Sequence, residues 1–212
     1  MPAVSIVNLL NKKYKTLGFE GQWHQAFSTP QASGVWFIWG NSGNGKTSFT
    51  LQLCKEVCRT IRLLYKNGRG AYLSLEESDD MTMQEAFYNA GMGTVKSKMK
   101  LIHNESIEQL SERLSTENNL KFVVIDSFQY AGMNYAQYKV FKEKHKDKLL
   151  IFISHADGKQ PAGRAAKSVM YDASLKIWVE GYKAFSKGRY IGPNGGIYTV
   201  WEEGAALYHG QS

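Results

Sequence analysis

Cysteine and proline are scarce in this chain, and long apolar runs are missing. Its 212 residues include only two cysteines and four prolines. Cys54 and Cys58 lie four residues apart in a helical pattern, which indicates core thiols of a reducing compartment rather than a disulfide framework. Neither cysteine has further metal-ligating residues near it at the spacing of a metal site. The apolar run Val35–Trp39 has the length of a strand and falls far short of the roughly 20 residues that span a bilayer, so we expect no membrane segment.

Internal repeats, low-complexity tracts and the order of a signal peptide are also missing. No basic segment precedes the apolar stretch at the start of the chain, and no small-residue cleavage site follows it. The length fits one domain, and a hydrophobic fraction of 43% is enough to build a core. These properties exclude a chain that is disordered over most of its length.

Positive charge is in excess. The chain has 26 lysines and arginines against 19 aspartates and glutamates, which gives a net charge of +7. Such an excess favours a phosphate-rich partner, although a basic soluble protein without one has the same composition.

Strands and helices alternate from residue 34 onward. The expected strands are 35–39, 71–75, 100–103, 121–125, 149–154, 174–179, 183–185 and 197–201. The expected helices are 4–15, 47–66, 82–90, 106–114 and 136–146, and a connecting loop is expected at 17–34. This order predicts an α/β fold with a mostly parallel central sheet, flanking helices and an antiparallel edge. We divide the chain into an N-terminal helix and connecting segment, 1–34, and a core, 35–212.

A glycine-rich loop follows the first strong strand and fits the pattern G-x-x-x-x-G-K-[ST]. Its glycines let successive backbone N–H groups face one anionic centre, and the N-terminus of the next helix adds positive potential. Lys46 supplies a mobile cation for the β- and γ-phosphates, and the Thr47 hydroxyl is a ligand for Mg²⁺. The residues expected to bind the nucleotide are Gly40, Asn41, Ser42, Gly43, Asn44, Gly45, Lys46, Thr47 and Ser48.

Two acidic positions at strand ends complete this site. Asp126 follows the apolar run Phe122–Ile125, so it lies at the carboxyl edge of the sheet, where it can order Mg²⁺ and its water. Glu76 and Glu77 end the strand after the loop helix and point to opposite sides. We expect Glu76 to orient the attacking water; a pair of exposed acidic residues is the alternative.

With these pieces in order, the chain resembles the RecA-like branch of P-loop ATPases, which includes recombinases, replicative helicases and clock-type ATPases. The resemblance covers residues 35 to about 201 and follows the segments YLSLEES, FVVIDS, IFISH and KIWVEGYKAFSKGRYIGPNG. It implies a RecA-like P-loop NTPase fold, Mg²⁺-dependent hydrolysis of ATP, and assembly of identical subunits into rings or filaments.

The resemblance also assigns residues beyond the phosphate loop. Arg189, with Lys187 beside it, matches a Lys-x-Arg segment that reaches into the neighbouring subunit's ATP site, although one extra residue separates it from Gly192. His155 stands where the family commonly has a glutamine that senses the γ-phosphate; a structural histidine is the alternative. The loop after His155 corresponds to one that binds single-stranded DNA in recombinases. Its phosphate-neutralising residues are Lys159, Arg164 and Lys167.

The short chain resembles the small phage-encoded recombinases of the single-strand-annealing type. The expected function is therefore that of an oligomeric ATPase on single-stranded DNA, acting in phage recombination or replication in the cytoplasm of a bacterial or phage-infected cell. A helicase-like motor, a regulatory ATPase that binds no nucleic acid, and a small P-loop kinase remain alternatives. Residues 139–148 hold five lysines, which fit a solvated helix face or a second DNA contact.

Overall fold

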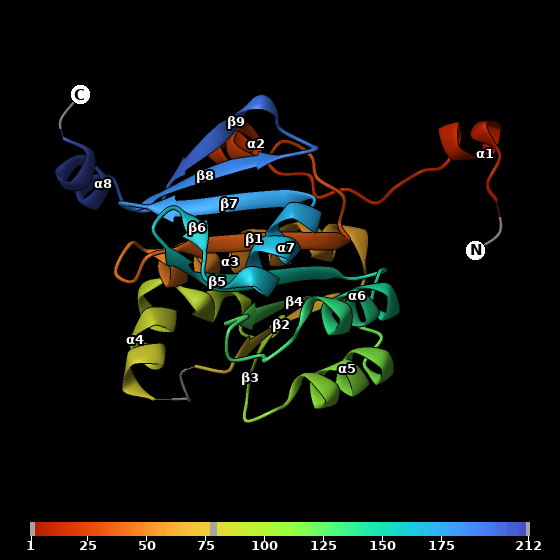
Figure 1. Cartoon of the computed structure of the whole chain (residues 1–212), viewed down its shortest axis with the longest axis horizontal. Coiled ribbons are helices and arrows are strands. Elements are labelled where there is room, and N and C mark those ends of the chain that lie inside the picture. Colours follow the sequence, from red (N-terminus) through yellow and green to blue (C-terminus); the bar gives the residue numbers. More distant parts are fainter. Residues whose placement is uncertain (1–2, 77–79, 211–212) are drawn as a thin grey trace.

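A computed structural model describes residues 3–76 and 80–210, and in these ranges nine strands form one sheet (Figure 1). The strands are β1 (Gly34–Gly40), β2 (Arg69–Ser74), β3 (Met99–His103), β4 (Leu120–Asp126), β5 (Leu149–Asp157), β6 (Gln160–Pro161), β7 (Leu175–Glu180), β8 (Lys183–Gly188) and β9 (Gly192–Thr199). The helices are α1 (Ile6–Leu10), α2 (Gly21–Phe27), α3 (Lys46–Leu64), α4 (Met81–Asn89), α5 (Ile107–Thr116), α6 (Tyr135–Lys144), α7 (Arg164–Asp172) and α8 (Glu202–His209), with a 3-10 turn η1 (Met92–Val95).

The sheet is mostly parallel, as the alternation of strands and helices predicts. Its order is β3-β2-β4-β5-β1-β7-β8-β9, and β6 pairs with β5. Neighbours from β3 to β7 pair in parallel, whereas β7, β8 and β9 pair antiparallel at one edge. The expected fold class is confirmed.

Both faces of the central strands are buried, which explains why β1 reads as an unbroken apolar run. Trp36 and Ile38 pack with α2, α3 and α4, while Phe37 packs with α5, α6 and α7 on the opposite face. Figure 1 shows helices on either side of the sheet. Each large side chain buried in this way stabilises the fold by roughly 1.5–3 kcal/mol.

The N-terminal segment differs from expectation. The predicted helix 4–15 is reduced to α1, and all side chains of this helix are outside the core. Forming the first turn of a helix costs backbone conformational entropy, and so short a helix has few hydrogen bonds to offset that cost. The predicted loop 17–34 contains α2, whose Phe27 is fully buried and whose Trp23 stacks on Tyr198 of β9 at 4.1 Å. Tertiary packing, rather than any cap signal, holds α2 in place.

Two C-terminal helices were also not expected. The segment from Arg164, predicted to be a loop, forms α7. Its apolar stripe, Ala166, Val169 and Met170, has helical spacing but is too short to stand out among the polar residues around it. The helix α8 follows β9 and is bound to the body by the buried Gly204 and Ala205.

The buried cysteines fit their expected role. Cys54 and Cys58 are free thiols in the core, and burial raises the pKa of both. Within residues 3–76 and 80–210, no helix is both long and apolar enough to cross a bilayer.

A buried histidine makes the fold sensitive to acid. His145 at the end of α6 is 1% exposed, and its Nε2 lies 2.9 Å from the Ser111 hydroxyl. Burial is the main cause that lowers its pKa to about 4, and the charges of Lys144 and Lys148 lower it further, with Asp147 acting in the opposite direction. A histidine in the unfolded chain has a pKa of about 6.5. Below that pH the unfolded chain therefore binds a proton that the folded chain does not bind.

We therefore expect the free energy of unfolding to fall by up to about 3 kcal/mol as the pH drops from about 6.5 to 4, through this group alone. His145→Gln removes the titration and should flatten the pH dependence in urea unfolding series. His24→Gln, at an exposed position, is the control and should follow the natural protein. Equal pH slopes for His145→Gln and the natural protein would contradict this origin of the acid sensitivity.

Candidate functional site

The phosphate loop lies between the end of β1 and the first residue of α3, at the carboxyl edge of the parallel strands. Lys46 begins α3, and its ammonium Nζ donates a hydrogen bond to the Asn41 carbonyl at 2.9 Å. Partial burial lowers the pKa of Lys46, while the carboxylates of Asp126 and Glu76 act in the opposite direction. The lysine is therefore held among the loop and two acidic side chains, as a phosphate-binding cation requires.

Steric contacts explain two of the loop glycines. A Cβ at Gly40 would lie 2.2 Å from the Val179 carbonyl oxygen, so the loop can leave the sheet here only as glycine. Gly45 has φ of 89°, and a Cβ there would meet the Tyr182 ring at 2.9 Å. Because these two residues have no side chain, the loop can pack closely against the end of β7 and the turn between β7 and β8.

Asn44 anchors the loop to this same turn. Its side-chain oxygen accepts a hydrogen bond from the Gly181 N–H at 2.8 Å, and its carbonyl accepts one from the Tyr182 N–H at 3.2 Å. The Tyr182 ring in turn packs edge-on against Trp201, with centroids 5.0 Å apart. Sequence reasoning missed Tyr182, because nothing in the local pattern links a turn near the C-terminus to the loop.

Asp126 lies where its strand position predicts. It is paired in register with Ser74 at the end of β2, so two strand ends meet beside the loop. The Tyr72 hydroxyl donates a hydrogen bond to Asp126 Oδ2. A tyrosine on the neighbouring strand therefore orients the carboxylate, and no pattern in the sequence predicts this contact.

Glu76 and His155 face each other across the site. His155 Nε2 lies 3.0 Å from Glu76 Oε2, and both side chains are about one-third exposed, at 37% and 36%. Gln129 fixes the end of β5: its Nε2 donates to the Ser154 hydroxyl at 2.8 Å, and its Oε1 accepts from the His155 N–H at 3.2 Å. Glu77 lies outside the described residues, so the choice between the two glutamates stays a prediction.

A cavity of about 350 Å³ brings these groups together. Its walls include the expected Lys46, Thr47, Glu76, Asp126 and His155. The loop residues Ser42, Gly43, Gly45 and Ser48 also line it, together with Ser74, Ser127, Ile153, Ser154 and Tyr182. One cation, several hydroxyls and two carboxylates thus converge on a space beside a positively polarised helix N-terminus.

The donor set fits Mg²⁺ held mainly by phosphate and water. Thr47 offers a hydroxyl and Asp126 a carboxylate, the hard oxygen ligands that this ion prefers. The buried Ser127 hydroxyl lines the same cavity and, among the described residues, has no hydrogen-bond partner. Over residues 3–76 and 80–210, no cluster of three or more metal-binding side chains occurs.

The structure separates Arg189 and Lys187 from this cavity. Lys187 pairs with Lys176 near the start of β7, and the Arg189 N–H donates to the Ser174 carbonyl at 3.2 Å. β7 pairs in parallel with β1, so its start lies at the edge of the sheet opposite the phosphate loop. Within one subunit, neither residue lines the cavity that holds Lys46.

The expected DNA-binding residues lie beside the phosphate loop and point to solvent. Lys159 is in the turn between β5 and β6, and Arg164 and Lys167 are on the first turn of α7; all three are exposed. The Asn41 side chain donates to the Gly158 carbonyl at 3.4 Å, so the phosphate loop touches the turn directly.

The aromatic residues after Asp126 divide between core and surface. Phe128 is 4% exposed and belongs to the core, whereas Tyr130 is 60% exposed, with its ring 6.3 Å from that of His155. Tyr130 is thus an exposed aromatic residue that a base can reach, and Tyr135 at the start of α6 is half-buried. The lysines of 139–148 are mostly solvated, but Lys148 is 3% exposed and donates to the Leu120 carbonyl at 3.0 Å.

Comparison with known proteins supports the fold. No family model matches the sequence, and no curated protein matches it. Among solved structures, the chain is similar to the crystal structure of flagellar accessory protein FlaH from Methanocaldococcus jannaschii, with a TM-score of 0.61. The match has 11% identity and covers 87% of this chain and 93% of that one. This likeness concerns the fold, and together with the sheet order and the phosphate loop it shows that the chain has a RecA-like α/β fold.

Proposed function

We propose that the protein is a Mg²⁺-dependent ATPase that assembles as an oligomer on single-stranded DNA and acts in recombination or replication of the phage type. The observation that carries the proposal is the convergence of Lys46, Thr47, Asp126 and Glu76 on one cavity at the end of β1. A phosphate cradle, a site for a hard cation and a carboxylate able to orient water are the parts that hydrolysis of a phosphoanhydride needs.

Each side chain has a distinct role in this proposal. The loop N–H groups and Lys46 hold the phosphate chain and stabilise the charge that develops on it. When bound, Mg²⁺ neutralises charge on the phosphate oxygens. Glu76 accepts a proton from the attacking water, and His155 holds the carboxylate in place by donating from Nε2.

Glu76→Gln should bind ATP with nearly unchanged affinity and hydrolyse it at least about a hundredfold more slowly, the scale expected for removal of a general base. Nucleotide binding and phosphate release are measured on the same preparation. Glu112→Gln, at an exposed position on α5, is the matched control and should be fully active. Full activity of Glu76→Gln beside an inactive Glu77→Gln would assign the role to Glu77 instead.

The separation of Arg189 from its own phosphate loop supports the proposed oligomerisation. If Arg189 serves an ATP site, that site belongs to a neighbouring subunit, because the two features lie at opposite edges of the sheet. A contact of this kind is heterologous and closes into rings or continues as filaments. Turnover per subunit should then rise with protein concentration.

Arg189→Ala and Lys46→Ala should each be inactive alone and regain part of the activity when mixed, since mixed interfaces pair an intact phosphate loop with an intact arginine. A mixture of Lys46→Ala with Glu76→Gln is the control and should stay inactive, because both defects lie in the same half of the site. Phosphate release is measured over a range of total concentrations. A strictly monomeric protein with fully active Arg189→Ala would contradict the assembly.

Contact between the phosphate loop and the β5–β6 turn supports a DNA site that responds to nucleotide. Asn41 bonds to Gly158, and the Trp39 indole N–H donates to the Lys159 carbonyl at 3.1 Å. The backbone of Lys159 is thus tied directly to β1 and its turn to the loop, while Arg164 and Lys167 follow on the first turn of α7.

Changing Lys159, Arg164 and Lys167 together to alanine should weaken binding of single-stranded DNA regardless of its sequence. The slope of log affinity against log salt should fall by about 2, since each lost phosphate contact contributes about 0.7 on single strands. Fluorescence titrations at several salt concentrations give the slope. Lys139→Ala/Lys144→Ala/Lys146→Ala removes equal charge from α6 and the turn that follows it; if this variant alone lowers the slope, the DNA site lies on that segment.

A second function has one observation in its favour. The similar structure is that of a flagellar accessory protein, FlaH, and a nucleotide-switched accessory role needs no nucleic acid. ATP turnover that single-stranded DNA leaves unchanged at both low and high salt would favour this role. Unwinding of a forked duplex would instead identify a motor.

A further inference from the structure

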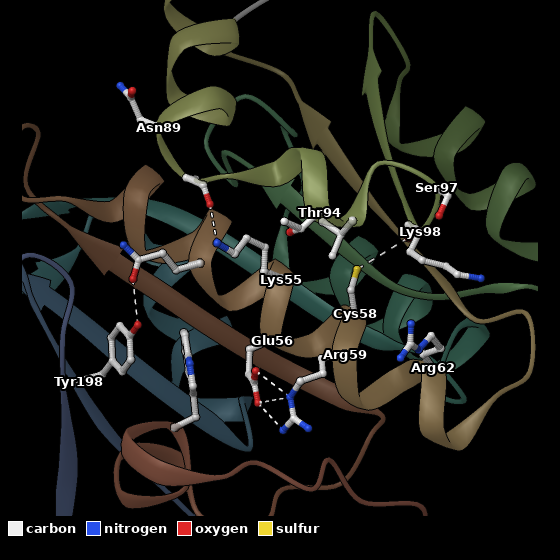
Figure 2. A pocket seen from close by; sticks show the side chains of 14 residues that line it. Lys55, Glu56, Cys58, Arg59, Arg62, Asn89, Thr94, Ser97, Lys98 and Tyr198 are labelled. Carbon is white, nitrogen blue, oxygen red and sulfur yellow. Dashed lines mark hydrogen bonds and ion pairs between the residues drawn. The ribbon is translucent and has the colours of Figure 1, made fainter.

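A second cavity, larger than the phosphate-loop cavity, lies on the same side of the sheet. It has a volume of about 590 Å³ and is formed by the second half of α3, the segment from the end of α4 to β3, and the aromatic pair Trp23 and Tyr198 (Figure 2). It contains no residue of the phosphate loop, and nothing in the proposed ATPase mechanism uses it.

The walls of this cavity carry an excess of positive charge. Lys55, Arg59, Arg62 and Lys98 line it against a single carboxylate, Glu56. Arg59 neutralises Glu56 through a two-pronged pair, with Nε 3.1 and 3.0 Å from the two carboxylate oxygens. Among the described residues, Lys55, Arg62 and Lys98 have no acidic partner, so three charges stay uncompensated. The Cys58 thiol adds no negative charge, because burial raises its pKa to about 12.

Hydrogen bonds to backbone carbonyls hold two of these cations, Lys55 and Arg59, in place. Lys55, Arg59 and Arg62 follow one another at helical spacing and share one face of α3, where like charges repel. Lys55 Nζ donates to the Ala90 carbonyl at 2.7 Å and ties α4 to this face. Lys98 enters from the opposite wall, where its carbonyl lies 3.8 Å from Cys58 Sγ. Figure 2 shows Arg62 and Lys98 on neighbouring parts of the rim.

Neutral donors complete the lining. Asn89 and Ser97 contribute an amide and a hydroxyl to the lining, whereas the Thr94 hydroxyl already donates to the Gly91 carbonyl at 3.0 Å. Trp23 and Tyr198 close the other end, and the Tyr198 hydroxyl bonds to Gln52 at 2.9 Å. A concave site with several cations and several neutral donors suits a ligand with many acceptor oxygens and more than one negative charge.

We propose that this cavity binds a ligand with several phosphate groups, which either a free oligophosphate or a nucleic-acid backbone can supply. The guanidinium of Arg62 matches the geometry of a phosphate edge, and the ammonium groups of Lys55 and Lys98 act as point charges around it. The site is separate from the ATP site, and the proposal stands whether or not the protein hydrolyses ATP.

The test uses inorganic tripolyphosphate as the probe and titration calorimetry as the readout. Lys46→Ala impairs the phosphate loop, so binding that persists in this variant reports on the second cavity. Adding Arg62→Ser and Lys98→Ser should weaken that binding at least about tenfold, because each charge-assisted hydrogen bond contributes roughly that factor or more. The control in the same background, Lys12→Ser/Lys13→Ser, removes equal charge from an exposed segment outside the cavity and should leave binding unchanged.

A second variant adds charge instead of removing it. Ser97→Glu places a carboxylate at an exposed position on the rim and should also weaken binding, without disturbing the core. Absence of any binding to Lys46→Ala protein would overturn the proposal, and so would equal affinities for the Arg62→Ser/Lys98→Ser variant and its control.

A competition experiment identifies which kind of molecule supplies the phosphate groups. If a short single-stranded oligonucleotide displaces tripolyphosphate from the Lys46→Ala protein, and does so only when Arg62 and Lys98 are present, a nucleic-acid backbone supplies the phosphates. If the oligonucleotide does not displace it, the ligand is a free oligophosphate or a nucleotide. Both results support the site.

Discussion

The parallel pairing of β1 with β5 on one side and β7 on the other is the constraint on which the site depends. It places the end of β1 among the ends of its neighbours, so that Gly40 meets Val179 with no room for a side chain. The chain must turn away from the sheet at that point, and α3 then begins with its N-terminus facing the edge where Asp126 and Glu76 lie. The electrostatics of the cavity follow from this geometry, since the positive end of a helix and two carboxylates share one small space.

Much of this arrangement could be predicted from the sequence, because its signals are local. The apolar run of β1, the glycine-rich loop and the helical spacing in α3 lie next to one another in the chain. Asp126 was placed correctly because an acidic residue after a buried parallel strand has only one edge of the sheet at which to lie. Helix α5 likewise begins where the helix 106–114 was expected, at the capping box that Ser106 forms with Gln109.

Long-range packing decided the parts that could not be predicted. Helix α2 has no side-chain cap and exists because Trp23 and Phe27 pack against partners more than a hundred residues away. Tyr182, Gln129 and Tyr72 orient the loop, β5 and Asp126 through contacts that leave no trace in the local pattern. The role of Arg189 is a different case. Its position shows only that it does not line the phosphate-loop cavity of its own subunit. The prediction that it serves the ATP site of a neighbouring subunit, drawn from the family resemblance, stays untested.

Helix α3 runs from Lys46 to Leu64, and its 19 residues extend about 28 Å at the usual rise per residue. Its first residue belongs to the phosphate loop, its later turns carry three of the four cations of the second cavity, and nine of its side chains are buried in the core. The same helix therefore contributes to the core and to the walls of both cavities. A cavity-forming change on its buried face, at Leu53 for example, would shift both sites together, so genetic screens would find lesions there that are pleiotropic although they touch no ligand.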